Sequence, residues 1–372
     1  MMIEEDSAFP EFHPILTDGC VGHEDAESLV LDSINSNRLH HAWLITGAKG
    51  IGKATFAYRV AKYLLANDTA KNQEDGLFGD TLESTHPVSL DIATDSPILG
   101  RIKAGGHGDL LTLERSMDEK RKVMRNFIVV DDVREAHAMF HATSSEGGWR
   151  IIVVDSADEM NRNAANALLK ILEEPPQKAL LLLVAHAPGK LLPTIRSRCR
   201  TIQLKPLSNE KVHQVLKEKF PNLDPNESQA LAELADGSPG KAIHLKAQDG
   251  LALYADILNI MANLKQMDVP ALHAMAAGLT SAKAFDKYTV FLDLLSNFFE
   301  RMIRYTATGE HEKHVSEKEI AIFNTLQSYC GVDRWLEVWE KMGKDRARAD
   351  GINMDKKLMI VSLFSNIAAL AK

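Results

Sequence analysis

The sequence predicts an α/β domain with a parallel sheet, followed by an all-helical region. Short apolar runs without polar alternation are typical of strands buried on both faces, and four such runs occur before residue 206. They alternate with segments of helical periodicity, which is the order expected of a parallel sheet covered by helices. After Pro206 the strand pattern ends. A chain of 372 residues is long enough for two or three domains.

The expected strands and helices alternate along the first half of the chain. Residues 67–108 depart from this pattern, because they are mostly polar and include a Gly-Gly-His-Gly run at 105–108. This stretch predicts a loop-rich insertion. The expected strands are 41–46, 110–113, 151–154 and 179–185, and the expected helices are 24–37, 53–66, 133–142 and 163–172.

The second half of the chain is expected to be helical throughout. Residues 208–245 suit three short helices that end near a Gly-Ser-Pro-Gly run at 237–240. Residues 250–372 continue with helical periodicity. Helix breaks are expected near Pro270, Gly309, Gly331 and Gly351.

The composition is that of a globular protein and excludes several classes. With 45% hydrophobic residues and no run of about 18 apolar residues, no membrane span is expected. The acidic N-terminus lacks the pattern of a signal peptide, so the cytoplasm is the expected location. A net charge of -8 argues against a stand-alone nucleic-acid binder. Cys20, Cys199 and Cys330 are far apart, which predicts reduced thiols and neither a disulfide framework nor a zinc site.

A phosphate-binding loop is predicted between the expected strand 41–46 and helix 53–66. The segment 47–53 fits the pattern G-x-x-x-x-G-K, in which backbone N–H groups and a helix N-terminus face the phosphates. The lysine of such a loop reaches the outer phosphates. ATP or ADP, with Mg²⁺, is therefore the expected ligand. The candidate nucleotide-binding residues are Gly47, Ala48, Lys49, Gly50, Ile51, Gly52, Lys53, Ala54 and Thr55.

The position after the loop lysine departs from the pattern. A serine or threonine there normally ligates Mg²⁺, but this chain has Ala54. Thr55 does not simply substitute for it, because one residue along a helix rotates the side chain by about 100°. The set of side-chain ligands for Mg²⁺ is therefore expected to be incomplete.

A second phosphate-handling element is predicted at the end of strand 151–154. Asp155 follows this strand and suits an Mg²⁺ ligand, if a nucleotide binds. Ser156 stands where many such ATPases have a glutamate, and a hydroxyl with no base beside it cannot accept a proton. Asp158 and Glu159 are interpreted as the acidic start of the next helix. Together with Ala54, these features make intrinsic ATP hydrolysis unexpected.

Other cations have two interpretations from the sequence. Arg196 and Arg198 follow a buried strand, and such arginines are most often solvated or ion-paired, although an arginine can also act on a neighbouring subunit's nucleotide. Lys241 is either an exposed lysine or a cation that faces the nucleotide. A mixed-charge cluster favours a solvated loop over a DNA contact. Its basic residues are Arg115, Lys120, Arg121, Lys122 and Arg125, with Glu114, Asp118 and Glu119 among them.

Two long runs closely resemble bacterial sliding-clamp-loader subunits of the AAA+ family. The first is Asn-Ala-Leu-Leu-Lys-Ile-Leu-Glu-Glu-Pro-Pro at 166–176, and the second is Pro-Thr-Ile-Arg-Ser-Arg-Cys at 193–199. Both are found in the delta-prime and gamma/tau branches. The segments 41–47 and 353–357 look like the delta-prime branch. The resemblance covers nearly the whole chain and is weakest over 67–108.

The resemblance implies an architecture and a set of partners. It implies a RecA-like AAA+ P-loop domain over 1–206, a three-helix lid over 207–247 and a helical collar over 248–372. Family members assemble as a hetero-pentamer of gamma/tau, delta and delta-prime subunits, which meets the sliding clamp and primer-template DNA. No membrane partner is expected.

The resemblance also implies roles for two cations. The arginine of the Ser-Arg-Cys motif, here Arg198, reaches in trans into the ATP site of the adjacent gamma/tau subunit, and Lys241 matches the lid cation. Many relatives carry a four-cysteine zinc module after the P-loop helix, but no cysteine occurs between 21 and 198, so zinc is not expected. The P-loop is more intact than in some delta-prime subunits. Nucleotide binding without turnover is thus left open.

These residues allow three functions. The first is a non-hydrolysing subunit of the clamp loader of the bacterial replicative polymerase, which donates Arg198. The second is an active gamma/tau-like ATPase, which Lys53 and Asp155 favour and Ala54 and Ser156 oppose. The third, a small-molecule phosphotransferase, leaves the helical C-terminal third unexplained.

Overall fold

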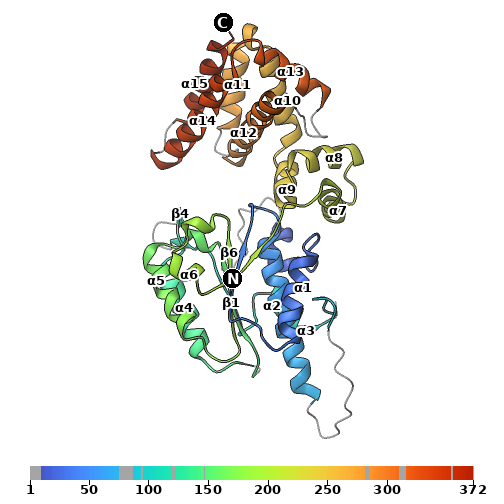
Figure 1. Cartoon of the computed structure of the whole chain (residues 1–372), viewed down its shortest axis with the longest axis vertical. Helices are drawn as coiled ribbons and strands as arrows, with labels where there is room; N and C mark the ends of the chain where they lie inside the picture. Colours follow the sequence, from blue (N-terminus) through green and yellow to red (C-terminus); the bar gives the residue numbers. More distant parts are fainter. Residues whose placement is uncertain are drawn as a thin grey trace. The chain divides into compact units, whose positions relative to one another are not determined.

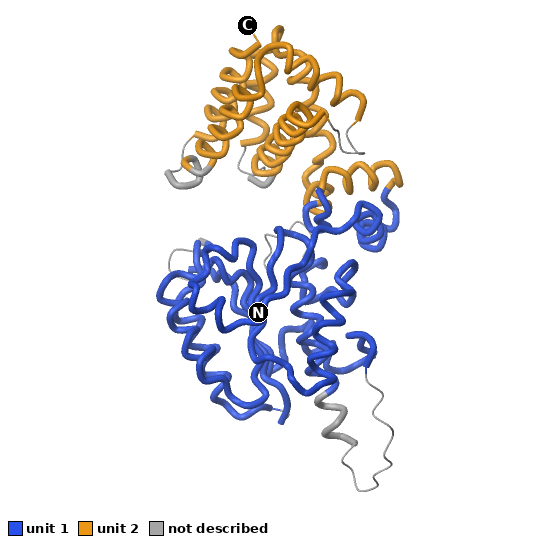
Figure 2. The backbone as a smooth tube through the Cα atoms, in the orientation of Figure 1, with its two compact units in different colours: residues 1–223, 236–241 blue, residues 224–235, 242–372 orange. Residues whose placement is uncertain are grey.

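The computed structural model describes residues 10–74, 87–93, 95–118, 123–145, 147–280, 285–309, 316–352 and 355–371. The chain forms two compact units (Figure 2). Residues 1–223 and 236–241 form the first unit, and residues 224–235 and 242–372 form the second. The predicted domain boundaries at 206 and 247 stay predictions, because the two compact units divide within the lid segment.

The first unit is built on a five-stranded parallel sheet in the order β2-β5-β6-β1-β7 (Figure 1). The interior strands are buried along almost their whole length, which explains why their sequences do not alternate between apolar and polar residues. The predicted α/β fold with a parallel sheet is confirmed. The strands are β1 (Ala42–Thr46), β2 (Leu110–Leu113), β5 (Arg150–Asp155), β6 (Ala179–Ala185) and β7 (Arg200–Gln203).

Helices cover both faces of this sheet, and β1 illustrates how. Trp43 and Ile45 belong to the core against α1, α2 and α3, whereas Ala42 and Leu44 belong to the core against α4 and α5. Because successive side chains of a strand point to opposite faces, one apolar strand serves both cores. The helices are α1 (Glu24–Asn35), α2 (Lys53–Glu74), α3 (Pro97–Lys103), α4 (Val130–His141), α5 (Arg162–Glu173) and α6 (Pro193–Arg196).

The predicted loop-rich insertion at 67–108 was wrong in part. Helix α2 continues to Glu74, and α3 lies within the same stretch. Side chains Ile98, Leu99 and Ile102 of α3 are buried, so this segment belongs to the core despite its polar surroundings. Residues 75–86 and 94 lie outside the described residues.

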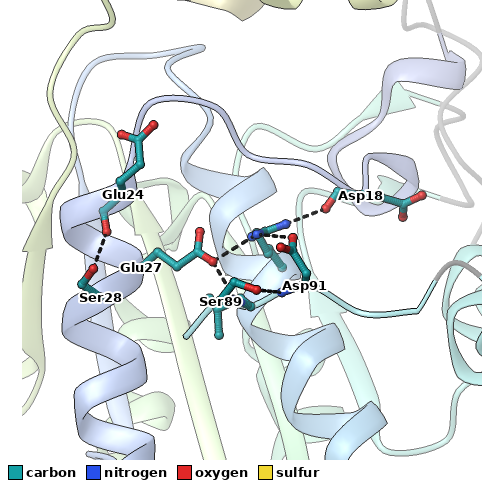
Figure 3. Close-up of polar contacts among 8 residues, drawn as sticks. Asp18, Glu24, Glu27, Ser28, Ser89 and Asp91 are labelled. Atoms are coloured by element: carbon teal, nitrogen blue, oxygen red, sulfur yellow. Dashed lines mark hydrogen bonds and ion pairs between the residues drawn. The ribbon is translucent and has the colours of Figure 1, made fainter. Parts of the chain in front are cut away.

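Carboxylates around Arg59 attach residues 89–91 to the first two helices (Figure 3). The Arg59 guanidinium donates to Glu27 at 3.0 Å and to Asp91 at 2.8 Å, and also to the carbonyl of Asp18 at 3.1 Å. The backbone N–H of Leu90 donates to the same Glu27 carboxylate at 2.6 Å. These bonds hold residues 89–91 beside α1 and α2.

Two β elements were not predicted from the sequence. Strand β7 lies at the sheet edge, and Ile202 is its only buried residue, so its sequence carries little apolar signal. A two-stranded antiparallel pair is formed by β3 (Met117–Asp118) and β4 (Val123–Met124). Strands of two residues are too short to show any periodicity.

After β7 the described chain forms helices and no strand, as predicted. The three lid helices are α7 (Asn209–Lys219), α8 (Pro225–Leu234) and α9 (Pro239–Ala247). The break expected near Gly351 is confirmed, because α14 ends at Ile352 and α15 begins at Lys356. The C-terminal helices are α10 (Gly250–Ala262), α11 (Val269–Leu279), α12 (Phe285–Thr308), α13 (Glu317–Gln327), α14 (Val332–Ile352) and α15 (Lys356–Ala369).

A buried polar network fixes the packing of α10, α12 and α13 in the second unit. Glu319 is 4% exposed, accepts a hydrogen bond from Tyr254 and pairs with Arg301 at 3.3 Å. Its carboxylate also caps α13 by accepting the backbone N–H of Ser316. Because a buried charge without partners is costly, removal of any member should be destabilising.

Candidate functional site

The predicted phosphate loop is formed between β1 and α2. Gly47 and Gly50 have φ of 141° and 77°, a backbone region that favours glycine. A Cβ at Gly47 would lie 2.6 Å from the carbonyl oxygen of Leu204, so the loop packs tightly beside the end of β7. The loop therefore has the strand, turn and helix N-terminus that phosphate binding needs.

The lysine of the loop turns inward in this structure. Lys53 Nζ donates to the carbonyl oxygens of Gly47 at 2.8 Å and Ala48 at 2.6 Å, and the residue is only 3% exposed. Burial lowers the pKa of Lys53 to about 8, although the charge of Asp155 acts in the opposite direction. The ammonium therefore has to leave two carbonyl partners before it can contact a phosphate.

The start of α9 lies directly against the loop. Ser238 Oγ donates to the carbonyl of Lys49 at 3.0 Å, and the N–H of Gly240 donates to the carbonyl of Gly50 at 2.8 Å. The predicted lid cation, Lys241, pairs with Asp236 at 2.7 Å. Its ammonium is thus neutralised by a carboxylate of the same turn.

The second phosphate-handling element lies at the carboxyl end of β5. Burial raises the pKa of Asp155, with Ser156 and Lys53 acting in the opposite direction. Ser156 Oγ donates to Asp155 Oδ1 at 3.2 Å. Ala54 offers no oxygen, so Asp155 is the one predicted side chain suited to Mg²⁺.

His186 is a site residue that the sequence reasoning missed. Its Nε2 lies 2.9 Å from Ser156 Oγ, so the expectation that no base stands beside Ser156 was wrong. Burial lowers the pKa of His186 to about 4, and the charge of Lys53 adds to this effect, so the ring is neutral at pH 7. The sequence did contain a signal for His186, because this residue directly follows β6. Ligand-binding residues of parallel sheets cluster at the carboxyl ends of strands.

Asp158 was expected to open the next helix, but it does not. It lies in a 3₁₀ turn (Ala157–Glu159), and its carboxylate accepts the backbone N–H groups of His186 at 3.0 Å and Ala187 at 2.9 Å. Asp158 therefore holds the end of β6 beside the end of β5. The helix α5 is instead capped by Asn161.

Arg198 is ion-paired on the surface, one of the two interpretations of this arginine. Its guanidinium donates to the carbonyl of Thr194 at 3.0 Å and pairs with Glu173 at 2.8 Å. The side chain is 37% exposed. The basic groups thus differ in position: Lys53 is enclosed in its own loop, whereas Arg198 lies at the surface.

The described part of the basic cluster is largely neutralised. Arg115 pairs with Glu159 at 2.9 Å, and Arg125 donates to Ser116 at 3.0 Å and lies 3.9 Å from Asp132. This favours the solvated interpretation over DNA contact for these two residues. Lys120, Arg121 and Lys122 lie outside the described residues, as does Glu119.

The described parts of the chain carry neither a metal-ligand cluster nor a membrane-spanning helix. There, no three His, Cys, Asp or Glu side chains are grouped so as to hold a metal ion. Cys20, Cys199 and Cys330 are free thiols. None of the described helices is both long enough and apolar enough to span a bilayer.

Known proteins match this chain along most of its length. A family model described as DNA polymerase III, delta subunit, matches residues 22–208. The delta' subunit of DNA polymerase III from Pseudomonas aeruginosa is 32% identical over 336 residues, which is 89% of this chain and 92% of that protein. The tau subunit from Escherichia coli is 30% identical over 61% of this chain and 32% of its own length.

A solved structure of a DNA polymerase III gamma subunit-related protein from Thermotoga maritima covers 92% of this chain and 100% of its own, with 16% identity and a TM-score of 0.39. The family model covers half of the chain, and the Pseudomonas aeruginosa relative matches most of both sequences. The chain therefore belongs to the DNA polymerase III delta' subunit family.

Proposed function

We propose that this delta' subunit works without hydrolysing ATP itself, by donating Arg198 to the ATP site of a neighbouring gamma/tau subunit during clamp loading. The observation that carries the proposal is the exposed position of the Arg198 guanidinium. An arginine supplied in trans stabilises the charge that develops on the transferred phosphoryl group. The proposed assembly is a hetero-pentamer with gamma/tau and delta subunits, which acts on the sliding clamp and primer-template DNA in the cytoplasm.

The chain's own phosphate loop is proposed to bind ATP or ADP without turnover. Glycine geometry and the N-terminus of α2 support binding of phosphates. Ala54 removes a metal ligand, and Ser156 stands in place of a glutamate base. Lys53, Asp155 and Lys241 would contact the nucleotide or its Mg²⁺ after their present bonds are exchanged.

An active ATPase remains the second candidate, and one observation favours it. The His186 ring lies beside Ser156, so an imidazole stands next to the residue that replaces the glutamate base. However, a pKa of about 4 makes this imidazole a weak proton acceptor at pH 7. The non-hydrolysing function is therefore preferred.

The trans role of Arg198 is tested in the complex reconstituted with gamma/tau and delta subunits of the same organism. Arg198→Ala should leave assembly intact and reduce ATP hydrolysis at the adjacent site by about 10³-fold. The rate is measured with the other ATP sites disabled. Arg196→Ala is the matched control and should hydrolyse ATP like the wild type. Equal rates for Arg198→Ala and wild type would refute the trans role.

The second candidate is tested with the purified chain alone. No steady-state ATP hydrolysis above a Lys53→Ala control is expected. Hydrolysis that both Lys53→Ala and His186→Ala abolish would establish the active ATPase instead.

A further inference from the structure

We propose that Glu173 is a positioning residue for Arg198, which orders the guanidinium before it meets the anion of a neighbouring subunit. The inference rests on the proposed function and assigns a role to a second residue of the same surface. It starts from the pair between Arg198 and Glu173 at 2.8 Å.

Two separate elements hold the Arg198 guanidinium. One terminal nitrogen donates to the carbonyl of Thr194 in α6, and the other pairs with Glu173 at the end of α5. An arginine has five N–H donors in a fixed plane, so these two contacts leave three donors for another ligand. The contacts therefore restrict the direction of the side chain without using up its capacity to bind a phosphate.

The position of Glu173 is itself well fixed. It is the last residue of α5, whose residues Leu168, Ile171 and Leu172 are buried in the core. His41, which directly precedes β1, places its Nε2 3.1 Å from the carbonyl oxygen of Leu172 and so ties the end of α5 to the sheet. The C-terminus of a helix also carries negative potential, which favours a cation at this place.

The pair contributes little to folding but can contribute to preorganisation. Both side chains are exposed, at 37% and 50%, and exposed ion pairs add little to stability. A free arginine side chain loses rotational entropy when a ligand orders it. A partner that has already ordered it lowers this loss at the moment of phosphate contact.

A competing effect has the opposite sign and is therefore distinguishable. A carboxylate beside the guanidinium also repels an incoming phosphate. If repulsion dominated, removal of Glu173 would accelerate ATP hydrolysis by the neighbour. If positioning dominates, as proposed, removal slows it, and Glu173→Gln restores most of the rate because an amide oxygen still accepts the hydrogen bond.

The chain provides a matched control in the next residue. Glu173 and Glu174 line the same cavity of about 290 Å³ between α4 and α5. Only Glu173 is paired with Arg198 among the described ion pairs. Glu174→Ala therefore removes the same charge from the same cavity and leaves the Arg198 contact in place.

The experiment measures kcat and KM for ATP in the reconstituted complex with the other ATP sites disabled. Glu173→Ala should lower kcat roughly threefold with little change in KM. Glu173→Gln should retain more than about half of the wild-type kcat, and Glu174→Ala should match wild type. In the Arg198→Ala background, Glu173→Ala should have no further effect. Circular dichroism melts of each variant should coincide with the wild type.

The outcomes separate this inference from the proposed function. An unchanged rate in Arg198→Ala would refute the trans role. A loss in Arg198→Ala with an unchanged or higher rate in Glu173→Ala would keep the trans role and overturn the positioning role. An equal loss in Glu174→Ala would also overturn it, because the effect would then reflect charge alone.

Discussion

Lys53 and Arg198, two cations of the first compact unit, are held in opposite ways. Lys53 is 3% exposed and donates to two carbonyls of its own loop. Arg198 is 37% exposed and held by one carbonyl and one carboxylate at the surface. Lys53 must break two buried hydrogen bonds before it can contact a phosphate, whereas the Arg198 guanidinium has further N–H donors that can bind one.

The two cations differ in what a phosphate ligand would have to displace. The loop around Lys53 is closed by its own lysine and by the start of α9. A bound phosphate would have to replace those bonds, so part of its binding energy is spent on rearrangement. The surface around Arg198 needs no such rearrangement.

The largest effect is expected from Gly50→Ala, which should destabilise the closed loop around Lys53. Gly50 has φ of 77°, and a Cβ there would lie 2.5 Å from Ser238 Oγ and 3.1 Å from the backbone nitrogen of Lys241. The free energy of unfolding should fall by about 2–3 kcal/mol, measured by urea denaturation. Gly189→Ala, where a Cβ meets open space, is the control and should be unchanged. An equally stable Gly50→Ala would show that the loop is not closed by α9.

Lys53→Met tests whether the inward lysine carries an unfavourable buried charge. The pKa of Lys53 in the folded chain, about 8, lies below its usual value of 10.5, so the unfolded chain binds more protons between these pH values. Wild-type stability should therefore rise relative to Lys53→Met as pH increases through this range. At pH 7 the variant should be more stable by about 1–2 kcal/mol, and at pH 10.5 the difference should vanish. A constant difference across urea titrations at both pH values would contradict the inward charge.

Ala54→Thr tests whether the phosphate loop lacks only a metal ligand. The restored hydroxyl should tighten Mg²⁺-dependent binding of ATP to the isolated chain about tenfold. Isothermal titration calorimetry of ATP binding, in Mg²⁺ and in EDTA, separates a gain in affinity due to Mg²⁺ ligation from a gain due to packing. A similar gain in EDTA would mean that the hydroxyl acts by contacts other than Mg²⁺.

The smallest effect is expected from Lys241→Ala. Loss of the exposed pair with Asp236 should change the free energy of unfolding by less than about 1 kcal/mol. If Lys241 turns to the nucleotide, ADP affinity should fall about threefold, whereas Lys205→Ala should have no effect. Unchanged ADP affinity in Lys241→Ala would leave it as a surface lysine.

Much of the first unit could be predicted because its signals are local. Ala179–Ala185 is apolar at every position, and Gly47–Lys53 has a spacing that few other loops share. Strand β7 was missed because one buried residue, Ile202, gives no period. Helix α3 was missed because seven residues in a polar stretch provide too few turns to compare.

The candidate site was only partly predictable for the same reason. Asp155 and Arg198 were found from motifs that lie within one segment. His186 was missed because it is 30 residues from Ser156, and its role depends on the pairing of β5 with β6. Asp158 was misread because its partners are 28 and 29 residues away.

Local sequence patterns were enough to predict the alternation of strands and helices, the phosphate loop, the lack of a hydroxyl at Ala54 and the family. These properties depend on residue type and short spacing, which the chain carries before it folds. Folding of the chain turns Lys53 inward, brings His186 beside Ser156 and pairs Glu173 with Arg198. Contacts of these kinds arise when packing brings side chains together in space, and short-range patterns do not encode them.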